Sequence, residues 1–103
     1  MPRPDLVFSA LASPVRRETL LLLKDRPWSV GELADHFGIA APSMSRHLSV
    51  LRAAALVTET REGNHVFYHV EAEALAHSVG AFLSAVCPTQ IEGRRGRSAQ
   101  GES

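Results

Sequence analysis

In this 103-residue chain, the residues best suited to bind another molecule form a run of short hydroxyl side chains that also contains one arginine and one histidine. The run comprises Pro42, Ser43, Ser45, Arg46, His47 and Ser49. On a helical wheel Ser43, Arg46 and Ser49 lie opposite an apolar stripe, and such groups can approach base edges and phosphates closely. The pattern predicts a surface that binds nucleic acid, although an ordinary solvated helix face has a similar composition. Arg52, further along, suits a phosphate contact and an ion pair with a carboxylate equally well.

A second polar group is expected at the tip of a β-hairpin. Residues 57–60 and 66–70 are rich in β-branched and aromatic side chains, and they flank Glu62-Gly63-Asn64. A glycine beside an asparagine tolerates the positive backbone angles of a tight turn. The predicted tip carries Arg61, Asn64 and His65. These side chains could reach a groove or a phosphate, but polar residues also collect at hairpin tips for no functional reason, so both interpretations stay open.

Capping signals divide the first part of the chain into helices. Asp5 can cap a helix that extends to about residue 11. Ser13-Pro14 suits the start of a second helix that runs to Lys24, because proline needs no amide partner in a first turn. The leucines at 20–23 make this second helix apolar on all sides, which predicts that it is the buried centre of the fold.

The next two helices have the spacing of a helix-turn-helix. Ser29-Val30-Gly31-Glu32 has the form of a capping box, and Gly38 is well placed to end that third helix in a left-handed conformation. A fourth helix is expected from about 41 to 55, after a short turn around the glycine. Its buried stripe is expected to consist of Met44, Leu48, Leu51 and Ala55. A last helix is expected over about 71–86, and Pro88 ends it.

This order of elements predicts a mainly α-helical fold with a small β-hairpin, a winged helix-turn-helix of about five helices and a two-stranded wing. Residues 1–88 are expected to form one DNA-binding and dimerisation domain. Residues 89–103 turn to Gly, Arg, Ser, Gln and Glu, which cannot build a core, so a disordered polar tail is expected there. A monomer of this size buries a modest share of its surface, so pairing with a second copy would add stability.

The overall composition limits the possible functions. Eleven basic and eleven acidic side chains cancel, so any affinity for DNA must come from local clustering of charge. This balance leaves a winged-helix module that binds protein as an alternative. The sequence contains no phosphate loop, HExxH or dinucleotide fingerprint, which argues against an enzyme.

The cysteine content and the hydropathy indicate the cellular compartment. Cys87 is the only cysteine, so an internal disulfide is excluded and a cytoplasmic location is expected. A redox role for Cys87 would need a resolving partner, and the chain has none. The longest apolar run is far too short to span a membrane, so no membrane partner is expected.

These segments resemble the bacterial ArsR/SmtB repressors, a family of small dimeric winged-helix proteins. ALASPVRRETLLLL (10–23) resembles the junction of the first two helices, GELADHFGIAAPSMSRHLSVLRAAALV (31–57) the helix-turn-helix, and TREGNHVFYHV (60–70) the wing. The likeness is greater to the metal-independent, autorepressor-like branch than to the heavy-metal sensors. Ala40 and Ala41 depart from the serine and glutamine that relatives often carry, which removes a side-chain cap and a possible base contact.

The resemblance implies a homodimer that binds double-stranded DNA and regulates transcription, most simply as a repressor. The helix at 41–55 and the wing at 57–70 would read a near-palindromic operator. Family members dimerise through their first and last helices, whose apolar faces here comprise Leu6, Val7, Leu11, Leu75, Val79, Phe82 and Val86. The wide apolar face of the last helix agrees, because it needs more cover than one small monomer provides.

The metal sites of the family are missing at their usual positions. The helix that often carries a Cys-x-Cys pair reads GELADHF here, and the last-helix ligand positions fall on Ala72, Ala74, Ala85 and Pro88. A local group remains, with His69, Glu71, Glu73 and His77, and it could bind Zn²⁺ or Ni²⁺ with help from a partner chain. The alternative is a helix start with acidic residues near its positive end. No cofactor is required, and the effector is unknown.

Overall fold

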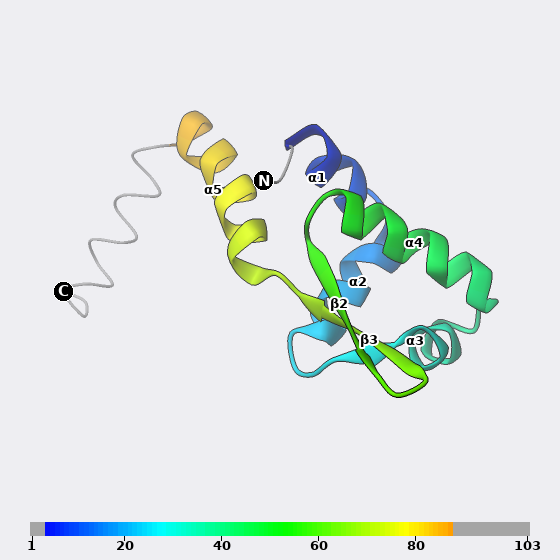
Figure 1. Cartoon of the computed structure of the whole chain (residues 1–103). Helices are drawn as coiled ribbons and strands as arrows, with labels where there is room; N and C mark the ends of the chain where they lie inside the picture. Colours follow the sequence, from blue (N-terminus) through cyan, green and yellow to red (C-terminus); the bar gives the residue numbers. More distant parts are fainter. Residues whose placement is uncertain (1–3, 88–103) are drawn as a thin grey trace, which may run out of the picture.

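Five α-helices and a three-stranded antiparallel sheet account for residues 4–87, the part of the chain that the computed structural model describes (Figure 1). The helices are α1 (Pro4–Leu11), α2 (Pro14–Leu23), α3 (Val30–Phe37), α4 (Ala41–Ala53) and α5 (Ala72–Val86). The strands are β1 (Trp28–Ser29), β2 (Val57–Glu62) and β3 (His65–Val70). The expected fold class is therefore confirmed, while the tail predicted for 89–103 lies outside the described residues.

Local capping interactions set the helix starts. The Ser13 hydroxyl accepts the backbone N–H of Arg16 at 3.3 Å, and Pro14 stands in the first turn of α2. At α3 the Ser29 hydroxyl accepts the Glu32 N–H at 3.1 Å, and the Glu32 carboxylate accepts the Ser29 N–H at 3.0 Å. Both predicted caps are confirmed. The cap predicted at Asp5 is wrong, because α1 already includes Pro4 and Asp5 lies in its first turn.

The turn between α3 and α4 uses the predicted glycine. Gly38 ends α3 with φ +67°, a left-handed conformation that costs glycine little. At its other end α4 stops at Ala53, two residues earlier than expected, and Ala55 adopts φ +62° outside the helix. Ala54, fully buried, takes the place in the core that the periodicity had assigned to Ala55.

The core lies where α1, α2, α3 and α4 meet the base of the hairpin. Its largest fully buried side chains are Leu33, Met44, Leu48, Leu51, Leu56, Val7 and Thr19. The prediction that α2 is buried on all sides is wrong. This helix buries Leu20 and Leu23, but Leu21 is 59% exposed, because α1, α4 and β3 pack against one side of α2 only.

The sheet has the order β1-β3-β2, with one strand more than the predicted hairpin. In β2 and β3, Glu62 pairs with His65, so the strands extend further than expected and only Gly63 and Asn64 form the turn. Gly63 has φ +61°, which places a glycine at the first central position, as in a type II′ turn. The unpredicted β1 is two residues long, too short to leave a periodic pattern, and it pairs with β3.

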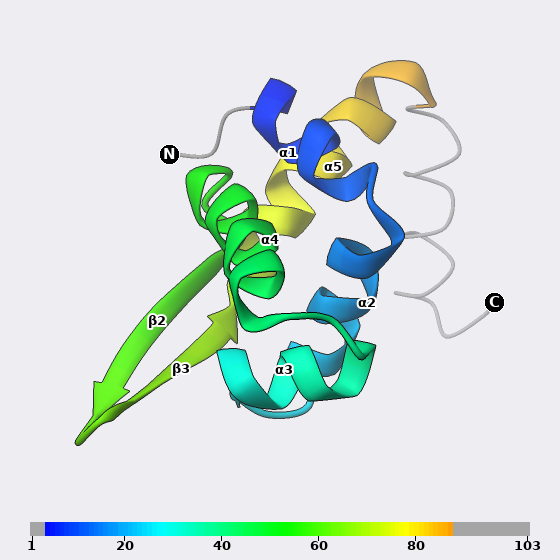
Figure 2. The ribbon, with the colours of Figure 1, turned by 90° about the vertical axis from the view of Figure 1, so that its right-hand side faces the viewer.

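The turn of the hairpin projects away from the helices, as a wing (Figure 2). At the opposite side of the molecule α1 and α5 lie next to each other (Figure 1). Within the described range, no helix combines the length and apolar character needed to cross a membrane.

Candidate nucleic-acid interface

Helix α4 separates a fully buried side from a polar side. Met44, Leu48 and Leu51 have no exposed surface, so the remaining positions of the helix must face outward. Of the predicted site residues on α4, Pro42, Ser45, Arg46 and Ser49 are exposed, and Ser43 and His47 are half-buried. The helix therefore presents hydroxyl, guanidinium and imidazole groups to solvent along one side.

The start of α4 has no side chain that satisfies its first amides. Ala40 is the N-cap residue and makes no side-chain cap, as the two alanines at 40 and 41 led us to expect. Pro42 occupies the first turn, where its missing N–H removes no helical hydrogen bond. The first turn thus combines free backbone donors with the positive end of the helix dipole, next to Ser43.

Arg46 and Ser43 interact one turn apart on this surface. An Arg46 guanidinium nitrogen, Nη2, donates to the Ser43 hydroxyl at 3.3 Å, and the Arg46 side chain is exposed. A guanidinium carries several donors in a rigid fork, so this single contact leaves others available for a phosphate or a guanine edge.

His47 is held from behind by a residue that the sequence had not singled out. Arg16 Nη1 lies 3.1 Å from His47 Nδ1, although 31 positions separate the two residues along the chain. The pKa of His47 is lowered by burial first, and then by the positive charges of Arg16 and Arg46. The imidazole is therefore neutral at pH 7.

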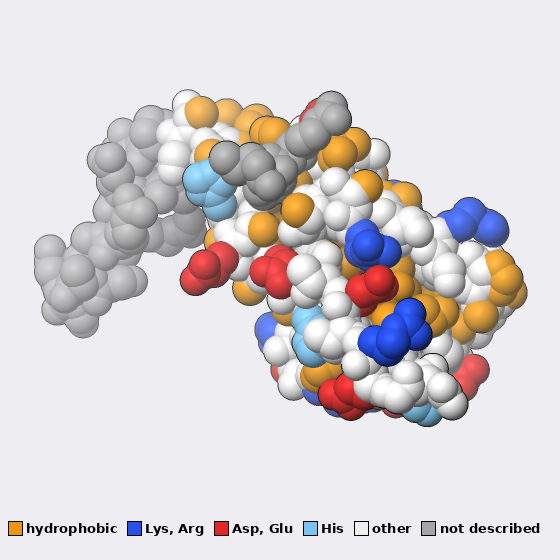
Figure 3. All heavy atoms as spheres, viewed as in Figure 1, with side chains coloured by type: hydrophobic (Ala, Val, Ile, Leu, Met, Phe, Trp, Pro, Cys, Tyr) orange, Lys and Arg blue, Asp and Glu red, His pale blue; other side chains and the backbone are white. Residues whose placement is uncertain are grey.

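The second group of predicted residues lies at the end of the wing. Arg61, Asn64 and His65 are all exposed, and they surround the turn that projects from the body (Figure 2). The hairpin therefore brings these three side chains together, at a distance from the polar side of α4. The face shown in Figure 3 mixes basic and acidic side chains, in keeping with the zero net charge.

Of the two roles considered for Arg52, a phosphate contact and an ion pair, the structure shows the ion pair. Its Nη1 lies 3.5 Å from a carboxylate oxygen of Glu59 on β2. Tyr68 lies beside this pair, and its pKa is raised by burial and by the Glu59 carboxylate. The ion pair thus joins the C-terminal half of α4 to the base of the wing.

The candidate metal ligands are not brought together. His69 Nε2 lies 2.8 Å from the Thr60 hydroxyl, and Glu71 accepts the hydroxyl of Thr58 at 3.0 Å. Glu73 and His77 are exposed on α5. No group of three or more His, Cys, Asp or Glu side chains that could hold an ion occurs within residues 4–87. The local group predicted from sequence spacing is therefore not a ligand set in this structure.

The predicted dimer residues differ in their accessibility. Val7 has no exposed surface and belongs to the core of the monomer, which corrects its assignment to an interface. Leu6, Leu11, Leu75 and Val79 are half-buried. Phe82 is 52% exposed and Val86 62%, and hydrophobic side chains gather over α1 and α5 in Figure 3. Phe8 and Leu83, which the periodicity did not single out, are also exposed.

Comparison with known proteins finds relatives over most of the chain. The family of helix-turn-helix domains matches residues 11–60. The transcriptional repressor SdpR of Bacillus subtilis is 35% identical over 80 residues, which are 78% of this chain and 89% of SdpR. The HTH-type transcriptional regulator KmtR of Mycobacterium tuberculosis is 48% identical over 67 residues, which are 65% of this chain. The match spans only 52% of the length of KmtR.

Solved structures resemble the whole described fold. The crystal structure of the ArsR family transcriptional regulator RHA00566 superposes with a TM-score of 0.71 and 32% sequence identity. The match covers 79% of this chain and 82% of that one. The polar side of α4 and the wing thus occur within a fold that is shared with transcription regulators.

Proposed function

Because this chain belongs to the ArsR/SmtB family of DNA-binding transcription regulators, we propose that it is a homodimeric repressor that reads a near-palindromic operator. The exposed polar side of α4, opposite a fully buried stripe, is the observation that carries this proposal. The relative SdpR is named a repressor, which favours repression over activation. Since the target is chromosomal DNA, we assign the protein to the cytoplasm.

In this proposal α4 is the recognition helix. Arg46 contacts a phosphate or a guanine edge, for which its guanidinium is suited, and it exchanges its bond with Ser43 for one with DNA. Ser43, Ser45, His47 and Ser49 line the same approach, and Pro42 opens the first turn. Arg61, Asn64 and His65 at the tip of the wing contact the neighbouring backbone or groove.

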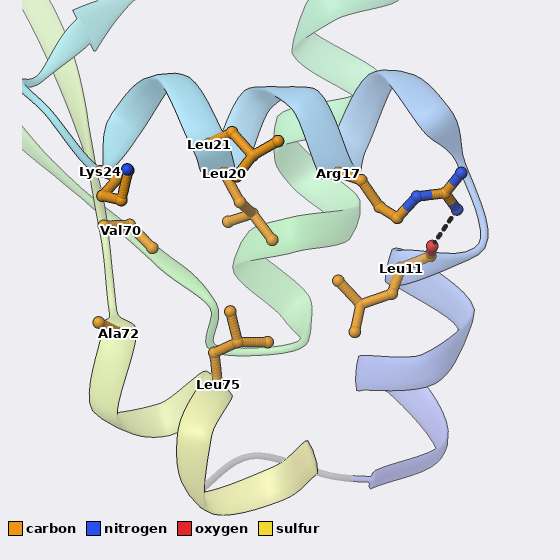
Figure 4. A pocket seen from close by; sticks show the side chains of 8 residues that line it. All are labelled: Leu11, Arg17, Leu20, Leu21, Lys24, Val70, Ala72 and Leu75. Atoms are coloured by element: carbon orange, nitrogen blue, oxygen red, sulfur yellow. Dashed lines mark hydrogen bonds between the residues drawn. The ribbon is translucent and has the colours of Figure 1, made fainter. Parts of the chain in front are cut away.

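The dimer is supported by two complementary features of α5. An apolar hollow with a volume of about 360 Å³ lies between α2 and the N-terminal end of α5 (Figure 4). Its apolar wall consists of Leu11, Leu20, Leu21, Val70, Ala72 and Leu75. At the other end of α5, Phe82 and Val86 expose most of their side chains.

A two-fold axis would bring these features together. In an isologous dimer the same surface meets itself, so antiparallel α5 helices place the C-terminal end of each against the N-terminal end of its partner. Phe82 and Val86 of one protomer would then fill the hollow of the other. Two recognition helices in such a dimer read successive major grooves about 34–36 Å apart.

A gel-shift titration with duplexes from the region upstream of the protein's own gene tests the proposal. We expect Arg46→Ala and His47→Ala to weaken binding by about tenfold or more, which is typical of a lost base or phosphate contact. Arg26→Ala is the matched control, because it removes an equal charge outside both the proposed DNA surface and the hollow beside α5. Sedimentation of each variant verifies that the dimer is intact. Full affinity in both α4 variants would reject α4 as the recognition helix.

A further inference from the structure

Arg16 joins three parts of the fold through one guanidinium. Its Nε donates to the backbone carbonyl of Ala10 at 2.7 Å, and its Nη2 donates to the carbonyl of Ser9 at 3.2 Å. Both carbonyls belong to the last turn of α1, and that of Ser9 also accepts the backbone N–H of Ala12 at 3.2 Å. The third nitrogen, Nη1, faces His47 on the recognition helix. The side chain is therefore held at both ends of its fork, and its position is defined.

The chemistry of this contact determines the state of the histidine. A guanidinium is always protonated and has no acceptor, so His47 Nδ1 must accept the hydrogen bond. A neutral imidazole that accepts at Nδ1 carries its proton on Nε2. His47 Nε2 has no hydrogen-bond partner in the described part of the chain. It is not buried either, because Trp28 Nε1 is the one buried side-chain nitrogen or oxygen there that lacks a partner. His47 Nε2 is therefore open to solvent.

We propose that Arg16 is a positioning residue for DNA recognition, which holds His47 in its neutral form with the proton on Nε2. The proposal rests on the proposed function of α4. It means that α4 offers DNA one defined N–H donor at this position, suited to a phosphate oxygen or to N7 of a purine. An imidazole without Arg16 could present either a donor or an acceptor there, and it would lose its fixed orientation.

Acid should release this contact. The charged groups that face His47 are Arg16, from α2, and Arg46, from the same helix, and both lower the pKa of His47 after burial does. Protonation of Nδ1 would place an N–H against the Arg16 guanidinium, so the two groups would repel each other. In the folded protein the doubly protonated ring forms at a lower pH than in an unfolded chain.

Nuclear magnetic resonance of the imidazole nitrogens tests the tautomer without DNA. In the wild-type protein we expect His47 to be protonated on Nε2 at pH 7 and to titrate at a lower pH than an unperturbed histidine. In Arg16→Met, which lacks every donor, the midpoint should rise and the preference for one tautomer should weaken. The control is Arg17→Met, which removes a like bond of 2.8 Å to the Leu11 carbonyl and should leave His47 unchanged. An unaltered His47 in Arg16→Met overturns the proposal.

A double-mutant cycle on DNA affinity tests the functional role. We use the upstream duplex that the wild-type protein binds best, with Arg16→Met, His47→Ala and the double variant. Arg16→Met should weaken binding about tenfold in the wild-type background and by less than about threefold when His47 is already absent. Equal losses in both backgrounds would mean that Arg16 acts independently of His47, and they would refute the positioning role.

The two experiments distinguish a failure of this inference from a failure of the proposed function. If the wild-type protein binds none of the duplexes, the proposed function fails, while the tautomer measurement still decides the state of His47. Should Arg16→Met not fold, Arg16→Lys replaces it, because lysine keeps the charge but lacks the fork. In Arg16→Lys a midpoint and tautomer equal to those of the wild-type protein would contradict the need for the guanidinium.

Discussion

The ring of Phe8 in α1 stands edge-on to the ring of Phe82 in α5, with centroids 5.3 Å apart and planes at 66°. This geometry is favourable for aromatic pairs, and it fixes the outer end of α5 against α1. The two residues that follow Phe8 supply the carbonyls that hold Arg16. Helix α1 therefore lies between the proposed dimer surface and the contact to His47 on α4.

The exposed end of α5 leads to a prediction about assembly. Phe82→Asp should dissociate the dimer, because it places a charge where the exposed part of the ring, beside its contact with Phe8, is expected to meet the partner's hollow. Burial of a phenylalanine side chain contributes about 1.5–3 kcal/mol, so the dimer dissociation constant should rise at least about tenfold. Sedimentation velocity over a range of concentrations measures the effect.

The matched control for Phe82→Asp is Ser84→Asp. Ser84 is exposed two residues away, and helical periodicity places it on the other side of α5. This variant should remain dimeric. A dimer of wild-type strength in Phe82→Asp would remove the basis for the antiparallel packing of α5.

Salt dependence should reveal which arginines contact phosphates. Each phosphate contact releases condensed counterions, so log affinity falls linearly with log salt concentration. We expect Arg61→Ala, at the tip of the wing, to reduce the magnitude of this slope by about one. Arg52→Ala should leave the slope unchanged, since its guanidinium pairs with Glu59. Fluorescence anisotropy with a labelled operator duplex at several salt concentrations measures both, and identical slopes for Arg61→Ala and the wild-type protein would exclude the wing contact.

The capping box of α3 predicts a pH-dependent stability. The pKa of Glu32 is lowered, first by the hydrogen bond from the Ser29 backbone N–H and also by Arg26. A carboxyl group whose folded pKa is depressed stabilises the protein above its unfolded pKa, near 4.5, and that stability is lost as the pH falls further. Glu32→Gln should abolish this component in urea titrations between about pH 7 and 3. Glu73→Gln, at the start of a helix without a side-chain cap, serves as the control. An equal loss of stability with acid in Glu32→Gln and in the wild-type protein would contradict a stabilising role of the capping box.

Titration with Zn²⁺ and Ni²⁺ tests the metal hypothesis. We expect no saturable heat in calorimetry and no change in operator affinity, because His69 is engaged with Thr60 and the acidic neighbour Glu71 with Thr58. The remaining pair, Glu73 and His77, offers too few ligands for a tight site. Stoichiometric binding that disappears in His77→Ala would instead assign a metal effector to α5.

Local signals in the sequence predicted most of the elements. The Ser29–Glu32 box and the glycines at 38 and 63 act through neighbours within a few residues, so their effect is already present in the chain. The apolar stripe of Met44, Leu48 and Leu51 identifies the buried side of α4, and it thereby identifies the polar side by exclusion. The helix-turn-helix and most of the candidate site followed from such short-range patterns.

Positions that depend on distant partners were not predictable in this way. Strand β1 exists because Trp28 and Ser29 pair with β3, about 40 residues later, and two residues carry no periodicity. Leu21 belongs to an apolar run but faces outward, whereas Val7 belongs to a face expected at the dimer interface but is completely buried. In each case the neighbours contributed by other elements determined the exposure.

The sequence by itself determined most of the helix boundaries, which side of α4 is buried, and the family to which the chain belongs, since capping, turns and periodicity are local properties of the backbone. Only the tertiary structure decided what each exposed group can do. It placed Arg16 against His47, Arg52 against Glu59 and Thr60 against His69, because polar contacts between residues on different elements form only after the elements have packed. The protonation state of His47 is thus a property of the fold, and the polar character of the exposed side of α4 is a property of the sequence.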